Sequence, residues 1–262
     1  ASGTGTVSLA AIGTNGAKGE ISTIAVTAGT SITLNGDIKT SEANGDATAP
    51  SLTLTGPVVL ATSSTITTDS GGTDGNISFT STVSGTSGSD QNLIIDSGTG
   101  TVTITGNIGP AVATALNKIE INKADGAGAE TGAITLSGNI GTNSTYGAGT
   151  DGTTGNGVYL GNAHTGSLTL GGTVYNFNNE ATFQAAAGGS NNDIRLTGSS
   201  PTIKTSDDAI LFETGVIKLS TGTTTISSAN DPITLTAVYG TDAENLSVDA
   251  GSSDSGTATV TV

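Results

Sequence analysis

A short pattern of alternating polar and apolar residues recurs along the chain. In its clearest copy, Thr101–Gly109, the apolar residues Val102 and Ile104 alternate with threonines, Gly106-Asn107 follows, and Ile108 comes next. Alternation with a period of two is typical of a β-strand with one buried face, and Gly-Asn is typical of a turn. The pattern therefore predicts a short strand followed by a bend.

Copies of this unit are spaced at irregular intervals. Their first residues are Ile32, Leu52, Ile77, Val102, Ile134, Leu168 and Ile194. Steps of roughly 20–50 residues indicate a solenoid, a propeller or another repeat array. A solenoid tolerates unequal steps because its loops lengthen without disturbing the stacked strands. The main alternative, a series of immunoglobulin-like sandwiches, requires a period of roughly 90–100 residues and buried aromatic anchors.

Stacking the units in register produces internal columns of apolar side chains. The first residues, from Ile32 to Leu168, form one column, and the residues two positions later form a second: Leu34, Leu54, Phe79, Ile104, Leu136 and Leu170. In parallel coils the backbone groups of each strand pair with the next coil, and outward threonines line up in ladders. The predicted fold is an all-β parallel β-helix (β-solenoid) with irregular coil lengths and about ten coils.

The pattern predicts one solenoid over residues 1–262, with the best-defined repeats in 32–174 and looser coils in 175–262. The first residue is not Met, which favours a processed chain or a segment of a longer one. Two Ala-rich stretches, Pro110–Leu116 and Glu180–Ala187, interrupt the alternation. A short helix and an irregular loop are both open for each of them.

Composition supports a thin core. Hydrophobic residues make up 34% of the chain and aromatic residues 3%, while Trp, Met and Cys are absent. A core of Ile, Val and Leu without large rings fits a narrow solenoid better than a thick sandwich. The lack of cysteine excludes disulfides and thiolate metal sites. Because no apolar run reaches about 18 residues, we expect no membrane span.

The charge balance excludes two classes of partner. The formal net charge is −15, with seven basic residues against 22 acidic ones. Nucleic acid and anionic membrane surfaces require a basic patch, which so few cations cannot provide. An acidic chain rich in Thr, Ser and Gly instead favours a secreted or cell-surface protein.

The repeat units, particularly Gly100–Gly109 and Gly132–Gly141, resemble the glycine- and threonine-rich strand repeats of large bacterial surface proteins. These include filamentous-haemagglutinin-like exoproteins and autotransporter passenger domains. The resemblance covers roughly Ile32 to Val174 and is looser elsewhere. It implies a right-handed parallel β-helix, export to the cell surface, and a role in adhesion, cell contact or extracellular scaffolding. No catalytic motif comes with it, so we expect a protein that is not an enzyme.

The chain offers few candidate site residues. Asp69, Asp74 and Asn76 flank a Gly-rich segment and could provide oxygen ligands for Ca²⁺. The spacing matches neither the EF-hand loop nor a calcium-binding nonapeptide repeat, so a solvated turn is the competing interpretation. No other cofactor is expected. His164, the single histidine, is expected in a surface turn, since without Cys or a second His it cannot anchor zinc.

Arg195, the single arginine, lies next to Asp193 in a predicted strand and has no second basic residue near it in the sequence. Enzymes that cleave acidic polysaccharides need clustered charges in a groove, so this placement argues against them.

Three hypotheses about function remain. The first is a structural or adhesive extracellular rod that contacts a host, cell or glycan surface. The second is a self-assembling filament or surface-layer subunit joined through its terminal strands, near Val7 and Val260. Unpaired strand edges at the ends of a solenoid favour such pairing, with another subunit or with flanking repeats. The third is a carbohydrate-active enzyme, which a cleft holding several acidic side chains would support.

Overall fold

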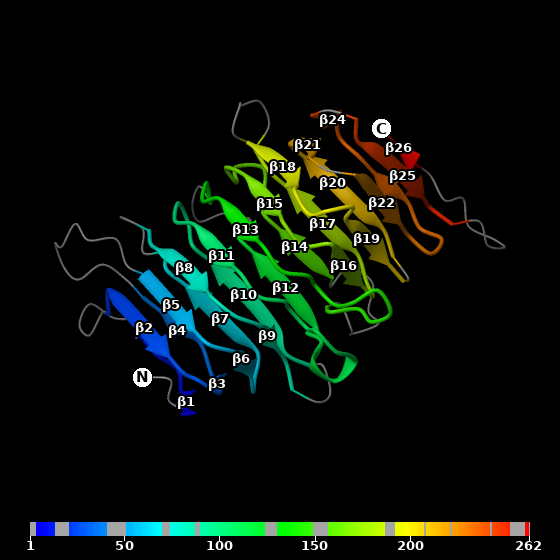
Figure 1. Ribbon diagram of the computed structural model, residues 1–262. Helices are drawn as coiled ribbons and strands as arrows, with labels where there is room; N and C mark the ends of the chain where they lie inside the picture. The colour runs from blue at the N-terminus through cyan, green and yellow to red at the C-terminus, as the bar shows by residue number, and fades with distance from the viewer. Residues whose placement is uncertain are drawn as a thin grey trace.

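The computed structural model is a β-solenoid in which three parallel sheets enclose one apolar core (Figure 1). It describes residues 4–13, 21–40, 51–69, 74–86, 90–123, 130–148, 157–186, 192–206, 208–220, 222–241, 243–251 and 260–261. Two of the sheets have nine strands each, which corresponds to about eight turns. The predicted parallel β-helix is therefore confirmed, although it has about eight turns and not the ten coils expected. In this part of the chain, no helix has the length and apolar character needed to cross a membrane.

We label the three sheets A, B and C, and each coil passes through them in the order C, A, B. Sheet C contains β2 (Thr23–Thr27), β5 (Ser51–Thr55), β8 (Asn76–Phe79), β11 (Val102–Ile104), β13 (Ile134–Leu136), β15 (Leu168–Leu170), β18 (Asp193–Leu196), β21 (Val216–Leu219) and β24 (Val238–Gly240). Sheet B contains β4 (Ile38–Lys39), β7 (Ser64–Thr67), β10 (Asn92–Asp96), β12 (Lys118–Ile121), β14 (Val158–Leu160), β17 (Ala181–Gln184), β20 (Ile210–Thr214), β23 (Ile233–Thr234) and β26 (Val260–Thr261).

Sheet A consists of two four-stranded parts. The first contains β1 (Thr6–Leu9), β3 (Ser31–Leu34), β6 (Val58–Leu60) and β9 (Val83–Ser84), and the second β16 (Val174–Phe177), β19 (Thr202–Thr205), β22 (Thr223–Ser227) and β25 (Asn245–Asp249). Single bridges through Ile108 and Ile140 connect the two parts. The corner loops between strands have different lengths, so the spacing of the units along the sequence is irregular while the strands stay stacked.

The predicted internal columns are correct from the second coil onward. Leu52, Ile77, Val102, Ile134, Leu168 and Ile194 pair in this order in sheet C, and so do Leu54, Phe79, Ile104, Leu136, Leu170 and Leu196. The prediction is wrong for Ile32 and Leu34, which lie in sheet A between β1 and β6. Their places in sheet C are taken by Ile24 and Val26. All three sheets face the same core, so a strand's apolar alternation does not tell which side it belongs to.

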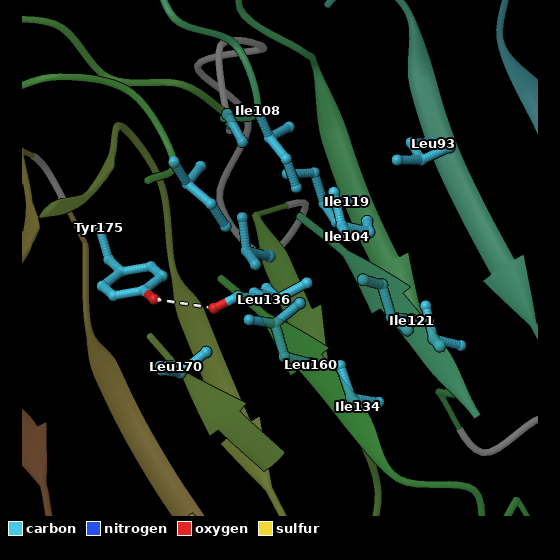
Figure 2. Packing of buried hydrophobic residues seen from close by; sticks show 14 of the residues in the cluster. Leu93, Ile104, Ile108, Ile119, Ile121, Ile134, Leu136, Leu160, Leu170 and Tyr175 are labelled. Atoms are coloured by element: carbon cyan, nitrogen blue, oxygen red, sulfur yellow. Dashed lines mark hydrogen bonds between the residues drawn. The ribbon is translucent and has the colours of Figure 1, made fainter. Parts of the chain in front are cut away.

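The inward residues of the sheets meet in a continuous core. Figure 2 shows Ile104, Leu136 and Leu170 of sheet C together with Ile119 and Leu160 of sheet B, all at most 1% exposed. Tyr175 is fully buried among them, and its hydroxyl accepts a hydrogen bond from the Gly172 amide at 2.7 Å. The same hydroxyl lies 3.5 Å from the carbonyl oxygen of Leu136, to which it donates (Figure 2). Burial raises the pKa of Tyr175 well above its ordinary value.

Stacked glycines form the corner between sheets C and A. An added Cβ on Gly138, Gly172 or Gly198 would come within 2.8 Å of backbone atoms of the preceding coil. Only glycine allows the coils to approach this closely. Beside the glycines, Asn107 Oδ1 accepts a hydrogen bond from the amide of Asn139 at 2.9 Å in the next coil. The interpretation of Gly106-Asn107 as the corner of each coil is therefore confirmed.

The two Ala-rich stretches have different structures. In Pro110–Leu116, residues Val112–Thr114 form a 3-10 helix, as one of the two alternatives predicted. In Glu180–Ala187, both alternatives are wrong for Ala181–Gln184, because these residues form β17 of sheet B. Ala181 and Phe183 are fully buried at inward positions there, so tertiary packing overrides the helical preference of alanine. Ala187 lies outside the described residues.

Candidate functional site

One outward column of sheet C combines hydroxyl, cationic and aromatic side chains. We call it the outer column, and it contains Ala25, Thr53, Ser78, Thr103, Thr135, Thr169, Arg195, Lys218 and Tyr239, which are register partners from coil to coil. Apolar residues flank every member except Tyr239, which lies between Val238 and Gly240, so alternation directs these side chains away from the core. The predicted ladders of outward threonines are confirmed here.

The middle of the outer column is an uncharged row of hydroxyls from Thr53 to Thr169. Within the described residues, these five side chains make no hydrogen bond to other protein groups. Neighbouring members lie about one strand spacing apart, roughly 4.8 Å. Since each hydroxyl can both donate and accept, the row offers a regular series of hydrogen-bonding groups to a ligand.

The outer column ends in two cations and an aromatic ring. Arg195 and Lys218 are direct register partners, and Lys218 is in turn the partner of Tyr239. Asp193 lies beside both cations, with Oδ2 at 2.6 Å from Lys218 Nζ and 3.4 Å from Arg195 Nη2. The Asp193 side chain is 3% exposed, whereas the side chains of Arg195 and Lys218 are each 37% exposed and Tyr239 is 60% exposed. One buried carboxylate thus orients two accessible cations.

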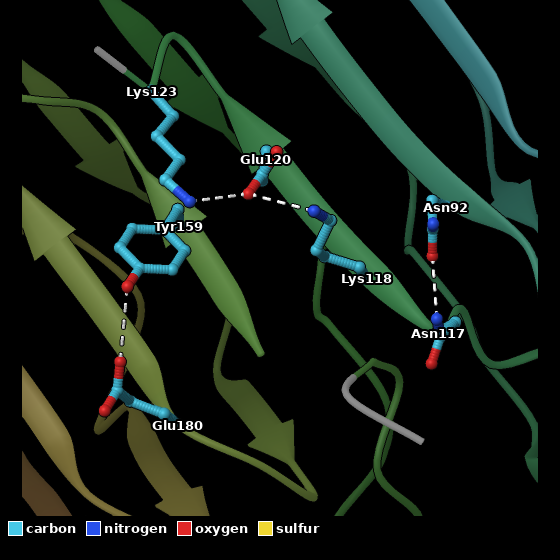
Figure 3. A network of polar contacts seen from close by, with 7 residues as sticks. All are labelled: Asn92, Asn117, Lys118, Glu120, Lys123, Tyr159 and Glu180. Atoms are coloured by element: carbon cyan, nitrogen blue, oxygen red, sulfur yellow. Dashed lines mark hydrogen bonds and ion pairs between the residues drawn. The ribbon is translucent and has the colours of Figure 1, made fainter. Parts of the chain in front are cut away.

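A second polar network lies on the outer face of sheet B (Figure 3). Glu120 Oε1 accepts from Lys123 at 2.8 Å and lies 3.1 Å from Lys118 Nζ. Lys123 Nζ also lies 3.9 Å above the ring of Tyr159, whose hydroxyl is 3.4 Å from Glu180. The network connects three successive coils through β12, β14 and the residue before β17, so it holds the stack together.

The two carboxylates of this network have opposite pKa shifts. Burial acts to raise the pKa of Glu120, but hydrogen bonds from Lys123 and Lys118 outweigh it, so the pKa is lowered. The pKa of Glu180 is raised, first by burial and then by the charge of Asp208. The pKa of Tyr159 is raised by burial and by the charge of Glu180.

The predicted calcium ligands lie on both sides of residues 70–73, which are outside the described part of the chain. Thr68 and Gly75 are hydrogen-bonded to each other, which brings the flanking residues Asp69 and Asp74 to the same corner. Asp74 Oδ2 accepts hydrogen bonds from the amide and hydroxyl of Thr99 at 2.8 and 2.9 Å. Asn76 Oδ1 binds Thr101 in the same way. In the described ranges, no three acidic or histidine side chains converge as a metal site would require. Asp74 and Asn76 therefore already bind groups of the next coil, and calcium binding at this corner stays a prediction.

His164 lies in a turn next to a buried polar network of Asn162 and Glu130. His164 is exposed in a turn, as expected, and its amide donates to Asn162 Oδ1 at 2.6 Å. The Nδ2 group of Asn162 donates to Glu130 Oε2 at 2.8 Å and to the carbonyl of Asn122 at 2.6 Å. Glu130 is 2% exposed, so its buried carboxylate binds Asn162 at a corner of the coil. Its burial could not be predicted, because no apolar alternation surrounds it in the sequence.

A hollow of about 340 Å³ on the first coils of sheet B is lined by Asp37, Lys39, Thr65 and Thr67, among others. The Asp37 carboxylate accepts a hydrogen bond from the Thr65 amide at 2.8 Å, so it is already used within the protein.

The surroundings of Arg195 differ most from what the sequence predicts. The sequence shows no basic residue near it, but the fold places Lys218 directly beside it in the next coil. A signal for this pair exists, since aligning Ile194–Leu196 with Ile217–Leu219 puts the two cations at the same outward position.

No known protein family matches the chain, and no curated protein or solved structure matches it. The repeat pattern and the geometry described above are therefore the basis for the function proposed below.

Proposed function

We propose that this chain is a structural and adhesive rod of a secreted or cell-surface bacterial protein. The observation that carries the proposal is the outer column of sheet C, in which accessible hydroxyls repeat from coil to coil and end in Arg195, Lys218 and Tyr239. A stacked backbone holds these groups at fixed spacing, so a ligand does not have to order them on binding. The mechanism is display of a preformed contact surface, without a chemical step.

Composition agrees with this proposal. The net charge of −15 keeps the chain away from nucleic acid and anionic lipid, while hydroxyl-rich faces suit sugars and polar protein surfaces. The sheet B network contains two carboxylates, but Lys118 and Lys123 form ion pairs with Glu120, and the Tyr159 hydroxyl donates a hydrogen bond to Glu180. A display role fits this arrangement better than hydrolysis of polysaccharides.

The test is adhesion of the purified chain, immobilised on beads, to cell monolayers and arrayed glycans. The informative variant carries Thr103→Val and Thr135→Val, which remove two adjacent hydroxyls of the outer column while keeping side-chain shape. Its matched control carries Thr202→Val and Thr225→Val, which are adjacent outward register partners in sheet A. We expect the first pair to reduce adhesion and the second to leave it unchanged. Equal effects of both pairs, or no adhesion by the wild-type chain, would refute the proposal.

A second candidate function is a self-assembling filament. Among the described strands, β1 and β2 lie at one end of sheets A and C, and β24 and β25 lie at the other. Parallel strand edges of this kind can pair with the opposite end of another copy. Electron microscopy would distinguish the two functions, because ordered fibres favour assembly and isolated rods favour display.

A further inference from the structure

The two cations of the outer column stand out against the charge of the whole chain. The protein has only seven basic residues, yet the fold places Arg195 and Lys218 side by side on successive coils. Like charges this close repel each other unless a counter-charge lies between them. Asp193 provides that counter-charge, and its side chain is almost completely buried. The three groups together retain one positive charge at an exposed position.

The cations keep most of their donors available. An ammonium group has three donors and a guanidinium group five, and the structure assigns one donor of each to Asp193. The guanidinium fork matches a carboxylate in a bidentate geometry, and the ammonium group adds a point charge beside it. The arrangement is therefore oriented from below by Asp193 and open to an anion from above.

Tyr239 adds a different kind of contact to the same column. It is the register partner of Lys218 in the next coil and is 60% exposed. An exposed ring presents an apolar face with a polar tip, which suits the C–H face and hydroxyls of a sugar. On the other side of the cations, Thr169 continues into the row of hydroxyls.

We propose that Arg195, Lys218 and Tyr239 form a binding site for an acidic saccharide. The cations bind the anionic group of one sugar unit, the ring of Tyr239 packs against an adjacent unit, and the hydroxyl row from Thr169 receives the rest of the chain. A single net positive charge suits one carboxylate per sugar better than several sulfate groups per sugar, because the net charge of −15 repels additional negative charge. This inference rests on the proposed display function, because it names the ligand class of the same face.

The experiment compares binding of polygalacturonate and of its methyl ester to the purified chain by calorimetry. The ester keeps the sugar backbone but has no charge. We expect the wild-type chain to bind polygalacturonate at least about tenfold more tightly than the ester, since a hydrogen bond to a charged group contributes about 1.5–3 kcal/mol. Binding should weaken as salt is added, because these cations are exposed. A sulfated dextran is included to distinguish carboxylate from sulfate as the anion, and tighter binding of the dextran would assign the site to sulfated sugars instead.

The variants are Arg195→Gln, Lys218→Gln and Tyr239→Ala, and Lys204→Gln on the outer face of sheet A is the matched control. We expect each charge variant to lose about tenfold or more in affinity for polygalacturonate and the control to lose nothing. Removing one cation leaves Asp193 less well paired, so circular dichroism must show that the coils persist. Tyr239→Ala carries no such risk because the ring is exposed, and it should weaken binding of the polymer while the salt dependence stays the same.

Equal binding of polygalacturonate and its ester, or an equal loss from Lys204→Gln, would overturn the inference. If the chain adheres to cells through the hydroxyl row but ignores polygalacturonate, the acidic-saccharide site is wrong and the display function stands. If the wild-type chain adheres to nothing, both proposals are wrong.

Discussion

Ile104 provides the most direct test of the internal column. Its side chain is fully buried between Phe79 of the preceding coil and Leu136 of the following one. Truncation to alanine removes three carbons and leaves a cavity that the stacked backbone cannot close. We therefore expect Ile104→Ala to cost about 2–5 kcal/mol and the smaller change Ile104→Val to cost about 0.5–1.5 kcal/mol. Ile104→Asp would bury an unpaired charge and should prevent this coil from forming.

The neighbouring residue is the matched control. Thr103 lies in the same strand but points outward in the outer column, so Thr103→Ala should change stability by about 0.5 kcal/mol or less. Urea unfolding followed by far-ultraviolet circular dichroism measures both changes. Hydrogen exchange adds the location, because in a solenoid each coil contacts only its neighbours. Amides of β8, β11 and β13 should exchange faster in Ile104→Ala, while those of β22 should not.

A slip of one residue in register would exchange the inward and outward sides of the strand. If Thr103→Ala cost as much as Ile104→Ala, the assigned orientation of β11 would be wrong. If Ile104→Ala abolished binding of a ligand while stability was unchanged, the repeat would be a site and not a building unit.

Two further predictions use matched pairs of residues. Gly172→Ala should destabilise by about 1–3 kcal/mol, because its Cβ would lie 2.4 Å from the Gly138 carbonyl oxygen of the preceding coil, whereas the Cβ of Gly171→Ala would lie 3.3 Å from the Ser137 Cα and should cost less. Equal urea midpoints for the two variants would contradict the glycine corner. Glu180→Gln should stabilise the protein at neutral pH and Glu120→Gln should destabilise it, and both differences should fade as the pH falls towards and below 4.5. Chemical unfolding at several pH values measures these changes. If both variants changed the free energy of unfolding at neutral pH in the same direction, the prediction would be contradicted.

The opposite stability changes expected for Glu180→Gln and Glu120→Gln follow from proton binding. The folded state holds the proton of Glu180 more tightly than the unfolded state does, so its ionisation costs stability as the pH rises above the ordinary value of 4.5. For Glu120 the folded pKa is lowered, so its ionised form contributes stability above 4.5, and this contribution is lost as the pH falls through the folded pKa.

The strands and their register could be predicted because alternation reports directly on burial. The order from Leu52 to Ile194 follows from aligning the copies of one short unit. The assignment of Ile32 failed because sheets A and C bury the same residue types against the same core. Only the number of residues per coil separates the sheets, and the loops make that number irregular. The strand β17 was missed because an alanine can fill an inward position when its neighbours are large.

The candidate site was harder to predict because it depends on stacking. Arg195 and Lys218 meet only when the coils they belong to are in register, and Asp193 then lies close to both. The buried carboxylate of Glu130 shows the opposite situation, because nothing in its sequence neighbourhood signals its burial. Outward positions carry no apolar pattern, so their chemistry becomes visible only after the register of the inward positions is known.

The same reasoning connects stability with the proposed binding surface. The distance between the cations and Tyr239 is set by the strand spacing, which the glycine corners and the apolar columns maintain together. A defect in one inward position therefore separates outward partners that it does not touch. Conversely, an exchange at an outward position changes the ligand chemistry of one coil and leaves the coil itself intact. A solenoid of this kind can thus alter the surface it displays one coil at a time, while its core residues stay restricted to Ile, Val, Leu, Ala and a few aromatic rings.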